Sequence, residues 1–187
     1  MKRYNSYKPS GVSWIPEVPS HWETEKINAH FRERRVKVSD KDYPALSVAK
    51  IGIVPQLDDA VKTDNGDNRK LVRNGDFVVN SRSDRKGSCG VASHDGSVSL
   101  INIVLEIIDM NKDYIHLLFR SNNYIEEFYR NGRGIVADLW TTRYCEMRNI
   151  IIPIPPLKEQ EAIASFLDSK TFKIDNYVAE RERVIRA

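Results

Sequence analysis

This sequence of 187 residues contains few cysteines, no residues spaced as metal ligands and no long apolar runs. Cys89 and Cys145 are the only cysteines, and isolated thiols of this kind indicate a reducing compartment rather than a disulfide or a metal pair. The four histidines lack the spacing of metal ligands. No run approaches 18 apolar residues, and the first 20 residues lack the apolar core of a signal peptide. We expect no metal, no membrane and a cytoplasmic location.

Motifs of catalysis are also scarce. Residues 87–90 lack the Gly-Lys-Ser/Thr ending of a phosphate-binding loop, and no methyl-donor motif occurs. One group resembles an active site: Asp76, Asp84 and Lys86 could hold Mg²⁺ and activate a water. Asp76, however, follows Gly75 in an ordinary turn. We therefore expect a protein without enzymatic activity or cofactor, and a Mg²⁺-dependent nuclease is the alternative.

The sequence does contain patterns of an α+β fold. Trp14 and Trp22 mark an N-terminal arm pinned onto the core. The expected strand-like pieces cover residues 45–54 and 70–80, with turns at Gly52 and at Gly75-Asp76. Two more strands are expected over residues 90–93 and 98–108, joined as a hairpin at residues 94–96. The expected helices cover residues 26–35, 114–120, 124–130 and 139–148. Together these elements predict a mixed, β-rich domain over residues 1–155.

A long helix is expected over residues 156–187. Proline is tolerated in a first helical turn, and no Gly or Pro follows Pro156. At about 1.5 Å per residue such a helix is about 45 Å long. This exceeds what a small domain covers, so a coiled-coil partner helix is expected; a helix lying on its own domain is the alternative. The expected interface residues, spaced by three and four, are Ile163, Ala164, Leu167, Thr171, Ile174, Tyr177, Val178 and Ile185.

Basic and polar side chains gather on the expected loops of the domain. The net charge is +3, and the terminal helix from Leu157 is neutral, so the excess lies in the preceding residues. Arg, Lys and Asn side chains bind base edges, and Ser and Thr add phosphate contacts. These loops predict a nucleic-acid-binding surface. Its candidate residues are Lys62, Asn65, Asn68, Arg69, Lys70, Ser81, Arg82, Ser83, Arg85, Lys86, Arg133, Thr141, Thr142 and Arg143.

Three stretches resemble the specificity subunits of type I restriction–modification systems. Residues 7–22 resemble the usual opening of these subunits, and residues 75–91 resemble the middle of a target recognition domain. Residues 152–168, with the run IPIPPLKEQEAIA, are similar to the junction that begins the conserved spacer helix. The last stretch is the most specific of the three.

The resemblance implies a function and a set of partners. Such a subunit carries two target recognition domains, each followed by a conserved helix, and each domain reads half of a split double-stranded DNA sequence. The helices pair in antiparallel fashion. The subunit catalyses nothing and docks methylation subunits, and through them restriction subunits, in a prokaryotic cytoplasm. With one domain and one helix, this chain is expected to be either a half-subunit or a fragment of a longer subunit, and we favour the fragment. Two such chains are expected to form a homodimer through the helix. A purely structural dimerisation module is a further alternative.

Overall fold

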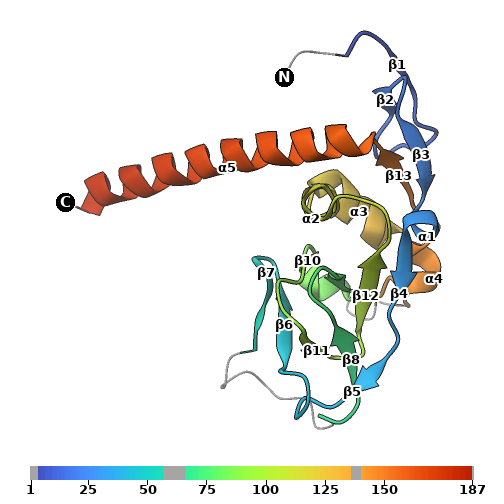
Figure 1. Cartoon of the computed structure of the whole chain (residues 1–187), viewed down its shortest axis with the longest axis vertical. Helices are drawn as coiled ribbons and strands as arrows, with labels where there is room; N and C mark the ends of the chain where they lie inside the picture. Colours follow the sequence, from blue (N-terminus) through green and yellow to red (C-terminus); the bar gives the residue numbers. More distant parts are fainter. Residues whose placement is uncertain (1–3, 57–65, 136–139, 187) are drawn as a thin grey trace.

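The structure is a computed structural model that describes residues 4–56, 66–135 and 140–186. Short strands and helices form the body, and one long helix ends the chain (Figure 1). The strands are β1 Tyr7–Pro9, β2 Glu17–Pro19, β3 Glu23–Lys26, β4 Phe31–Glu33, β5 Lys37–Val38, β6 Leu46–Ala49, β7 Gly52–Pro55, β8 Arg69–Val72, β9 Phe77–Asn80, β10 Cys89–Val91, β11 Gly96–Val98, β12 Asn102–Ile107 and β13 Ile151–Ile154. The helices are α1 Ile27–His30, the 3₁₀ helix η1 Ser83–Arg85, α2 Lys112–Phe119, α3 Asn122–Arg130, α4 Tyr144–Met147 and α5 Leu157–Arg186. This confirms the expected α+β fold with a long C-terminal helix.

An antiparallel sheet of order β10-β9-β12-β4 forms the centre of the domain. Because side chains alternate across a strand, Phe77 and Val79 of β9 face a large apolar cluster beneath the helices. Val78 lies between them and faces a smaller cluster, which Val72 and Val98 share from the neighbouring sheet of order β11-β8-β5. The central sheet is therefore buried on both faces, which explains the continuous apolar run of β9.

Helices α2 and α3 cover one face of the central sheet (Figure 1). Phe119 ends α2 and packs against Phe31 and Phe77, with ring centroids 5.4 and 4.9 Å away. The break between the helices comes at Ser121, whose hydroxyl accepts a hydrogen bond from the Tyr124 backbone N–H. Such a cap satisfies an N–H group that has no partner inside the helix. The two helices and their break agree with the prediction from sequence.

The N-terminal arm is fixed beside the start of α5. Strand β3 pairs with β13, the strand that leads into α5. The indole N–H of Trp14 donates to the carbonyl of Ile151 at 3.0 Å, and its ring meets Tyr124 edge-on at 5.8 Å. Trp22 donates its indole N–H to Glu159 at 3.0 Å. Both tryptophans thus anchor the arm, as the sequence suggested.

Glu159 is the main polar link between the arm and α5. Its carboxylate accepts hydrogen bonds from the Tyr4 hydroxyl at 2.9 Å and from Trp22, and it lies 2.7 Å from His21 Nε2. Burial alone would raise the pKa of Glu159, but the hydrogen bonds from Trp22, His21 and Tyr4 outweigh it and lower that pKa. Burial and the bond to Glu159 raise the pKa of Tyr4 to about 12. These contacts hold the first turn of α5.

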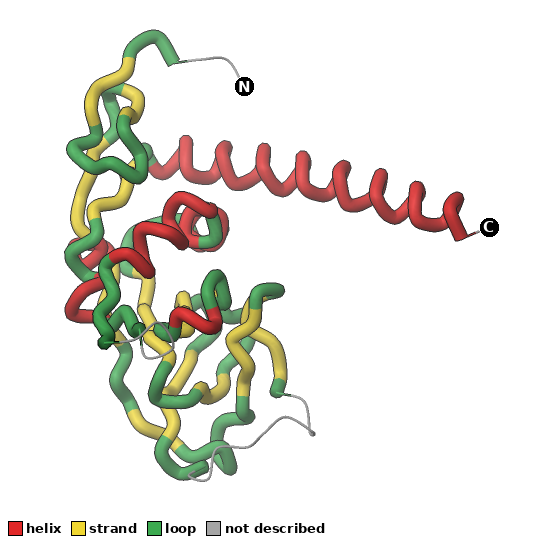
Figure 2. The backbone as a smooth tube through the Cα atoms, turned by 180° about the vertical axis from the view of Figure 1, so that it is seen from behind, coloured by secondary structure: helices red, strands yellow, loops and turns green. Residues whose placement is uncertain are grey.

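Helix α5 leaves the domain after two to three turns. Gln160 and Ala164 are buried; the Gln160 amide donates to the Pro155 carbonyl at 2.8 Å and accepts from the Asn111 N–H at 2.9 Å. From Leu167 to Val184 every residue is exposed. Figure 2 shows the helix projecting far beyond the rest of the chain. No helix among the described residues has the length and apolarity needed to cross a membrane.

Three expected elements differ in the structure. The helix over residues 26–35 ends at His30, because β4 follows and pairs with β12. The prediction of a hairpin between residues 90–93 and 98–108 is wrong, because β10 and β12 both pair with β9, and β11 pairs with β8. The helix over residues 139–148 is reduced to α4, since Thr141 is extended and bridges Arg82 and Arg133.

Candidate nucleic-acid interface

Three loops that lie far apart in the sequence meet at the end of β9. The Thr142 backbone N–H donates to the Ser81 carbonyl at 3.0 Å. Arg133 and Thr141 exchange both backbone hydrogen bonds, at 2.9 and 3.0 Å. Residues 140–143 therefore lie between the loop after β9 and the loop after α3. The structure thus brings together most of the loops that the sequence proposed for binding.

Three exposed arginines lie on these loops. Half or more of each side chain is exposed for Arg82, Arg85 and Arg133, at 50%, 66% and 85%. Their ion pairs are loose: Asp84 lies 3.2 Å from Arg82 and 3.7 Å from Arg85, and Glu146 lies 3.6 Å from Arg133. The two pairs with Asp84 are exposed on both sides, and such pairs contribute about 0–1 kcal/mol. An incoming phosphate can therefore displace them at little cost.

The remaining candidates of this group vary in exposure. Lys86 forms a 2.6 Å ion pair with Glu126 and lies over the ring of Tyr129. Arg143 is exposed. Lys62 and Asn65 lie outside the described residues. Partly buried positions are held by Asn68, Ser83 and Thr141.

Two basic candidates on β8 are engaged inside the protein. Arg69 is only 3% exposed, and its guanidinium donates to the Ser97 hydroxyl at 2.8 Å and to the Ser97 carbonyl at 3.0 Å. Lys70 donates to the Asn102 carbonyl at 2.7 Å and lies 3.9 Å from Glu33. Burial lowers the pKa of both groups. Arg69 is therefore withdrawn from the DNA-facing set, and Lys70 serves first to join β8 to β12.

Two hydroxyl candidates are also internal. The Ser81 hydroxyl donates to the Ile101 carbonyl at 2.6 Å, and the Thr142 hydroxyl donates to the Phe128 carbonyl at 2.9 Å. Ser81 is 3% exposed and Thr142 is fully buried. Their hydroxyls satisfy buried carbonyls. The expectation that these two side chains face DNA is wrong; they hold the loops in place instead.

The acidic residues of the nuclease alternative do not form one cluster. Asp76 is buried and accepts from Arg34 at 2.7 and 3.0 Å and from the Arg73 N–H at 2.8 Å. The hydrogen bond to Asp76 raises the pKa of Arg34 despite burial. Asp84 lies beyond the opposite end of β9, on the order of 10 Å away. Asp76 thus has a structural partner. Within the described ranges, no group of three or more His, Cys, Asp or Glu could hold a metal ion.

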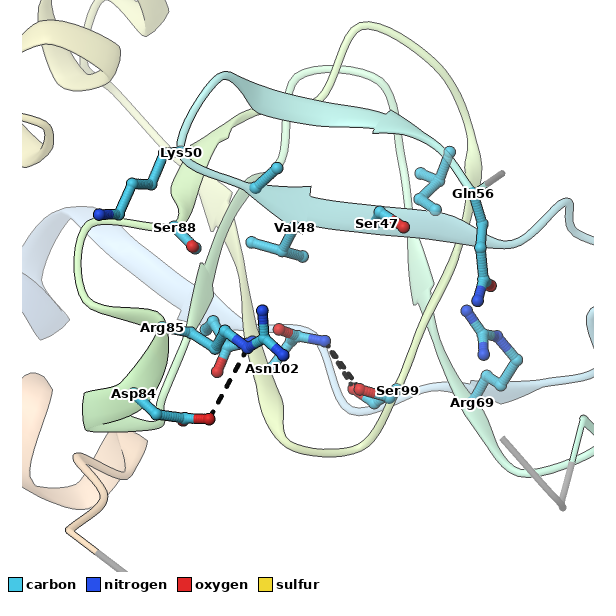
Figure 3. A pocket seen from close by; sticks show the side chains of 13 residues that line it. Ser47, Val48, Lys50, Gln56, Arg69, Asp84, Arg85, Ser88, Ser99 and Asn102 are labelled. Carbon is cyan, nitrogen blue, oxygen red and sulfur yellow. Dashed lines mark hydrogen bonds and ion pairs between the residues drawn. The ribbon is translucent and has the colours of Figure 1, made fainter. Parts of the chain in front are cut away.

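Two of the hollows beside these loops bring several candidate residues together. The smaller one, about 320 Å³, brings Lys70 beside Thr141 and Arg143, so three candidates share one surface. The larger one, about 780 Å³, lies between β6 and the loop that follows β9 (Figure 3). Its lining combines Lys50 and Arg85 with the amides and hydroxyls of neighbouring strands. This larger hollow combines positive charge, the Asp84 carboxylate and neutral hydrogen-bonding groups.

Comparison with known proteins assigns the family. A model of the type I restriction modification DNA specificity domain matches residues 37–178, which is most of the chain. The chain belongs to this family. The match includes all the loops described above and the exposed part of α5 up to Val178.

Solved structures share the fold of this specificity domain. One, reported for complex assembly and conformational transition of the type I R-M system, is 14% identical with a TM-score of 0.58. The match covers 91% of this chain and 42% of the solved chain. The HsdS subunit of Thermoanaerobacter tengcongensis is 16% identical with a TM-score of 0.56, and the match covers 91% of this chain and 41% of that chain. A type I S subunit from M. genitalium is 16% identical with a TM-score of 0.56, and the match covers 85% of this chain and 41% of that chain.

The specificity domain thus spans less than half the length of these solved chains. No curated protein sequence matches it.

Sequence reasoning missed the β6–β7 hairpin of the specificity domain as part of this surface. Lys50 lines the larger hollow, and Ile51 follows it at the turn. The available signal was an isoleucine at a turn before Gly52, where polar residues are usual. Only the fold shows that this turn lies near the arginine loop after β9.

Proposed function

We propose that this specificity domain reads one half of a bipartite sequence in double-stranded DNA and performs no catalytic step. The observation that carries the proposal is the meeting of three polar loops at the end of β9, where Arg82, Arg85 and Arg133 are exposed. Arginine contacts both guanine edges and phosphates. A buried two-faced sheet beneath the loops gives them a rigid base, as sequence readout requires.

Neutralising the loop after β9 tests the proposal. Replacing Arg82, Arg85 and Lys86 by Gln should weaken DNA binding and lower the slope of log affinity against log salt, by about 0.9 for each phosphate that the variant no longer neutralises. The matched control replaces Lys170, Lys173 and Arg183 of α5, which removes the same charge from exposed positions outside the loops. Equal affinity and equal slopes for the two triple variants would show that this loop does not bind DNA.

The exposed part of α5 supports a second proposal, pairing with another helix. Ile174, Tyr177 and Val178 are 61%, 56% and 47% exposed and lie on one stripe with Leu167 at 39%. Burying one Leu or Ile side chain is worth roughly 1.5–3 kcal/mol, so the stripe favours association. Two copies of this chain would pair in antiparallel, two-fold fashion. Arg181, which stacks on Tyr177 with its guanidinium carbon 5.1 Å from the ring centre, would lie near the edge of the contact.

The stripe does not include the whole predicted set. Ala164 is 3% exposed and Ile163 packs against the main core, so both belong to the contact between α5 and its own domain. The side chain of Ile185 lies outside the described part of the helix. The proposed interface is therefore Leu167, Thr171, Ile174, Tyr177 and Val178.

Sedimentation over a concentration series tests helix pairing. The wild-type chain should form dimers, and Leu167→Glu with Ile174→Glu should give monomers with an unchanged circular dichroism spectrum. Phe172→Glu is the matched control, because Phe172 is 68% exposed on the opposite side of α5. A monomeric wild type at high concentration would refute pairing.

Docking of methylation subunits, and of restriction subunits through them, completes the proposal. The chain would then direct methyl transfer in a prokaryotic cytoplasm without performing it. Supplying methylation subunits with S-adenosylmethionine should label duplexes only when this chain is added. Labelling that is independent of the chain would contradict the docking role.

A further inference from the structure

An apolar side chain stands in water at the tip of the β6–β7 hairpin. Ile51 occupies the turn between Ala49 and Gly52, and it is 80% exposed. The neighbouring apolar residues Val48 and Ile53 pack against the smaller core cluster, so the hairpin itself is well seated. Folding gains nothing from an isoleucine at this position. Turns favour Gly, Asn, Asp and Ser over Ile, which makes this residue a candidate for contact with a partner.

The tip is held rigidly from behind. Arg120, which follows α2, donates to the Lys50 carbonyl at 2.7 Å and to the Cys89 carbonyl at 3.0 Å. This guanidinium ties the turn to β10. Gly52 has φ of +124°, a conformation that side-chain-bearing residues rarely adopt, so the turn requires glycine there. Ile51 is thus presented in a fixed direction rather than on a loose loop.

The hollow behind the tip has hydrogen-bonding groups to spare. Ser88 is only 4% exposed and lines this hollow. The Asn80 side-chain oxygen accepts from the Arg82 N–H at 3.1 Å, which leaves its amide N–H groups for a ligand. Asn102 donates to Ser99, and its buried side-chain oxygen has no partner in the described part of the chain. Buried polar groups of this kind are normally satisfied.

The positions of these groups join the hairpin to the arginine loop. Figure 3 shows Lys50 and Ser88 at the same end of the hollow as Asp84 and Arg85, with Asn102 nearer its middle. Arg85 is one of the exposed arginines at the end of β9. The hairpin tip and that loop therefore border a single surface.

We propose that the β6–β7 hairpin is a second DNA-reading element of this domain. Ile51 packs against a thymine methyl group in the major groove, Lys50 contacts the adjacent phosphate, and Asn80 with Ser88 hydrogen-bonds base edges over the hollow. The major groove presents this combination of a methyl group with donors and acceptors. The inference rests on the proposed DNA-reading function and adds residues to its surface.

Selection of random duplexes by the full chain and its variants tests the hairpin. Ile51→Ser should lose preference for an A·T pair at one position and bind the selected duplex about tenfold more weakly. Lys50→Gln should weaken all sequences alike and lower the salt slope by about 1. Ile108→Ser is the matched control, since Ile108 is 53% exposed just beyond the far end of β12. Both hairpin changes are at the surface, and urea unfolding verifies that the variants remain folded.

The outcomes separate the two levels of the proposal. If the wild-type chain selects no sequence, the proposed DNA-reading function fails. If the wild type selects a sequence and Ile51→Ser, Lys50→Gln and Ile108→Ser all select it with equal affinity, only the hairpin inference is overturned. Loss of binding to a protein partner with unchanged DNA selection would overturn it as well.

Discussion

Replacing Asp76 by Asn tests whether this carboxylate is structural or catalytic. The carboxylate accepts three hydrogen bonds, two from Arg34 and one from the Arg73 backbone N–H. Removing one partner of a buried ion pair costs about 3–5 kcal/mol. The Arg34 side chain is 20% exposed and regains some hydration, so we expect a loss of about 2–4 kcal/mol. For a chain of this size that corresponds to a fall in Tm of about 10 °C.

Urea unfolding followed by tryptophan fluorescence measures this loss. Asp84→Asn is the matched control, because Asp84 is 43% exposed and its pairs with Arg82 and Arg85 are loose. It should cost no more than about 1 kcal/mol. Neither variant should change DNA integrity in Mg²⁺. A stable Asp76→Asn protein, together with a DNA-cleaving wild type that this change inactivates, would refute the structural account.

Two further predictions concern the start of α5. Because the folded-state pKa of Glu159 is lowered, its stabilising contribution is complete above the unfolded value near 4.5 and is lost as pH falls through the folded pKa. The free energy of unfolding should therefore change less between pH 7 and a pH below 4 in Glu159→Gln than in the wild type. An equal change in the two proteins would contradict the role of this link. Ala164→Leu should lower the free energy of unfolding by about 1–3 kcal/mol through overpacking, whereas Ala162→Leu on the exposed side should lower it little. Equal urea midpoints for the two variants would contradict the buried contact.

Local signals predicted the elements whose ends are encoded by neighbouring residues. Ser121 caps α3, and the prolines before Leu157 end β13 and allow α5 to begin. Such boundaries depend on hydrogen bonds and dihedral limits within a few residues. The turn at residues 50–51 followed from Gly52 in the same way.

Long-range pairing overruled local signals elsewhere. The Asp95-Gly96 pair is a strong hairpin signal, but the Asp95 carboxylate accepts from the Asn74 N–H at 2.8 Å and also binds Arg73. The turn therefore connects two sheets instead of two paired strands. The exposed stripe of α5 was visible from its spacing, whereas the burial of Arg69 and Thr142 followed only from packing against segments that are distant in the sequence.

Enrichment of random duplexes by the wild-type chain in Mg²⁺ tests the central claim most directly. Each enriched duplex should carry a short sequence in two inverted copies at a fixed spacing, because two chains joined through α5 would each read one half-site. The recovered strands should be intact. Enrichment that follows ionic strength alone without any shared sequence, or strands cut at defined positions, would contradict the account.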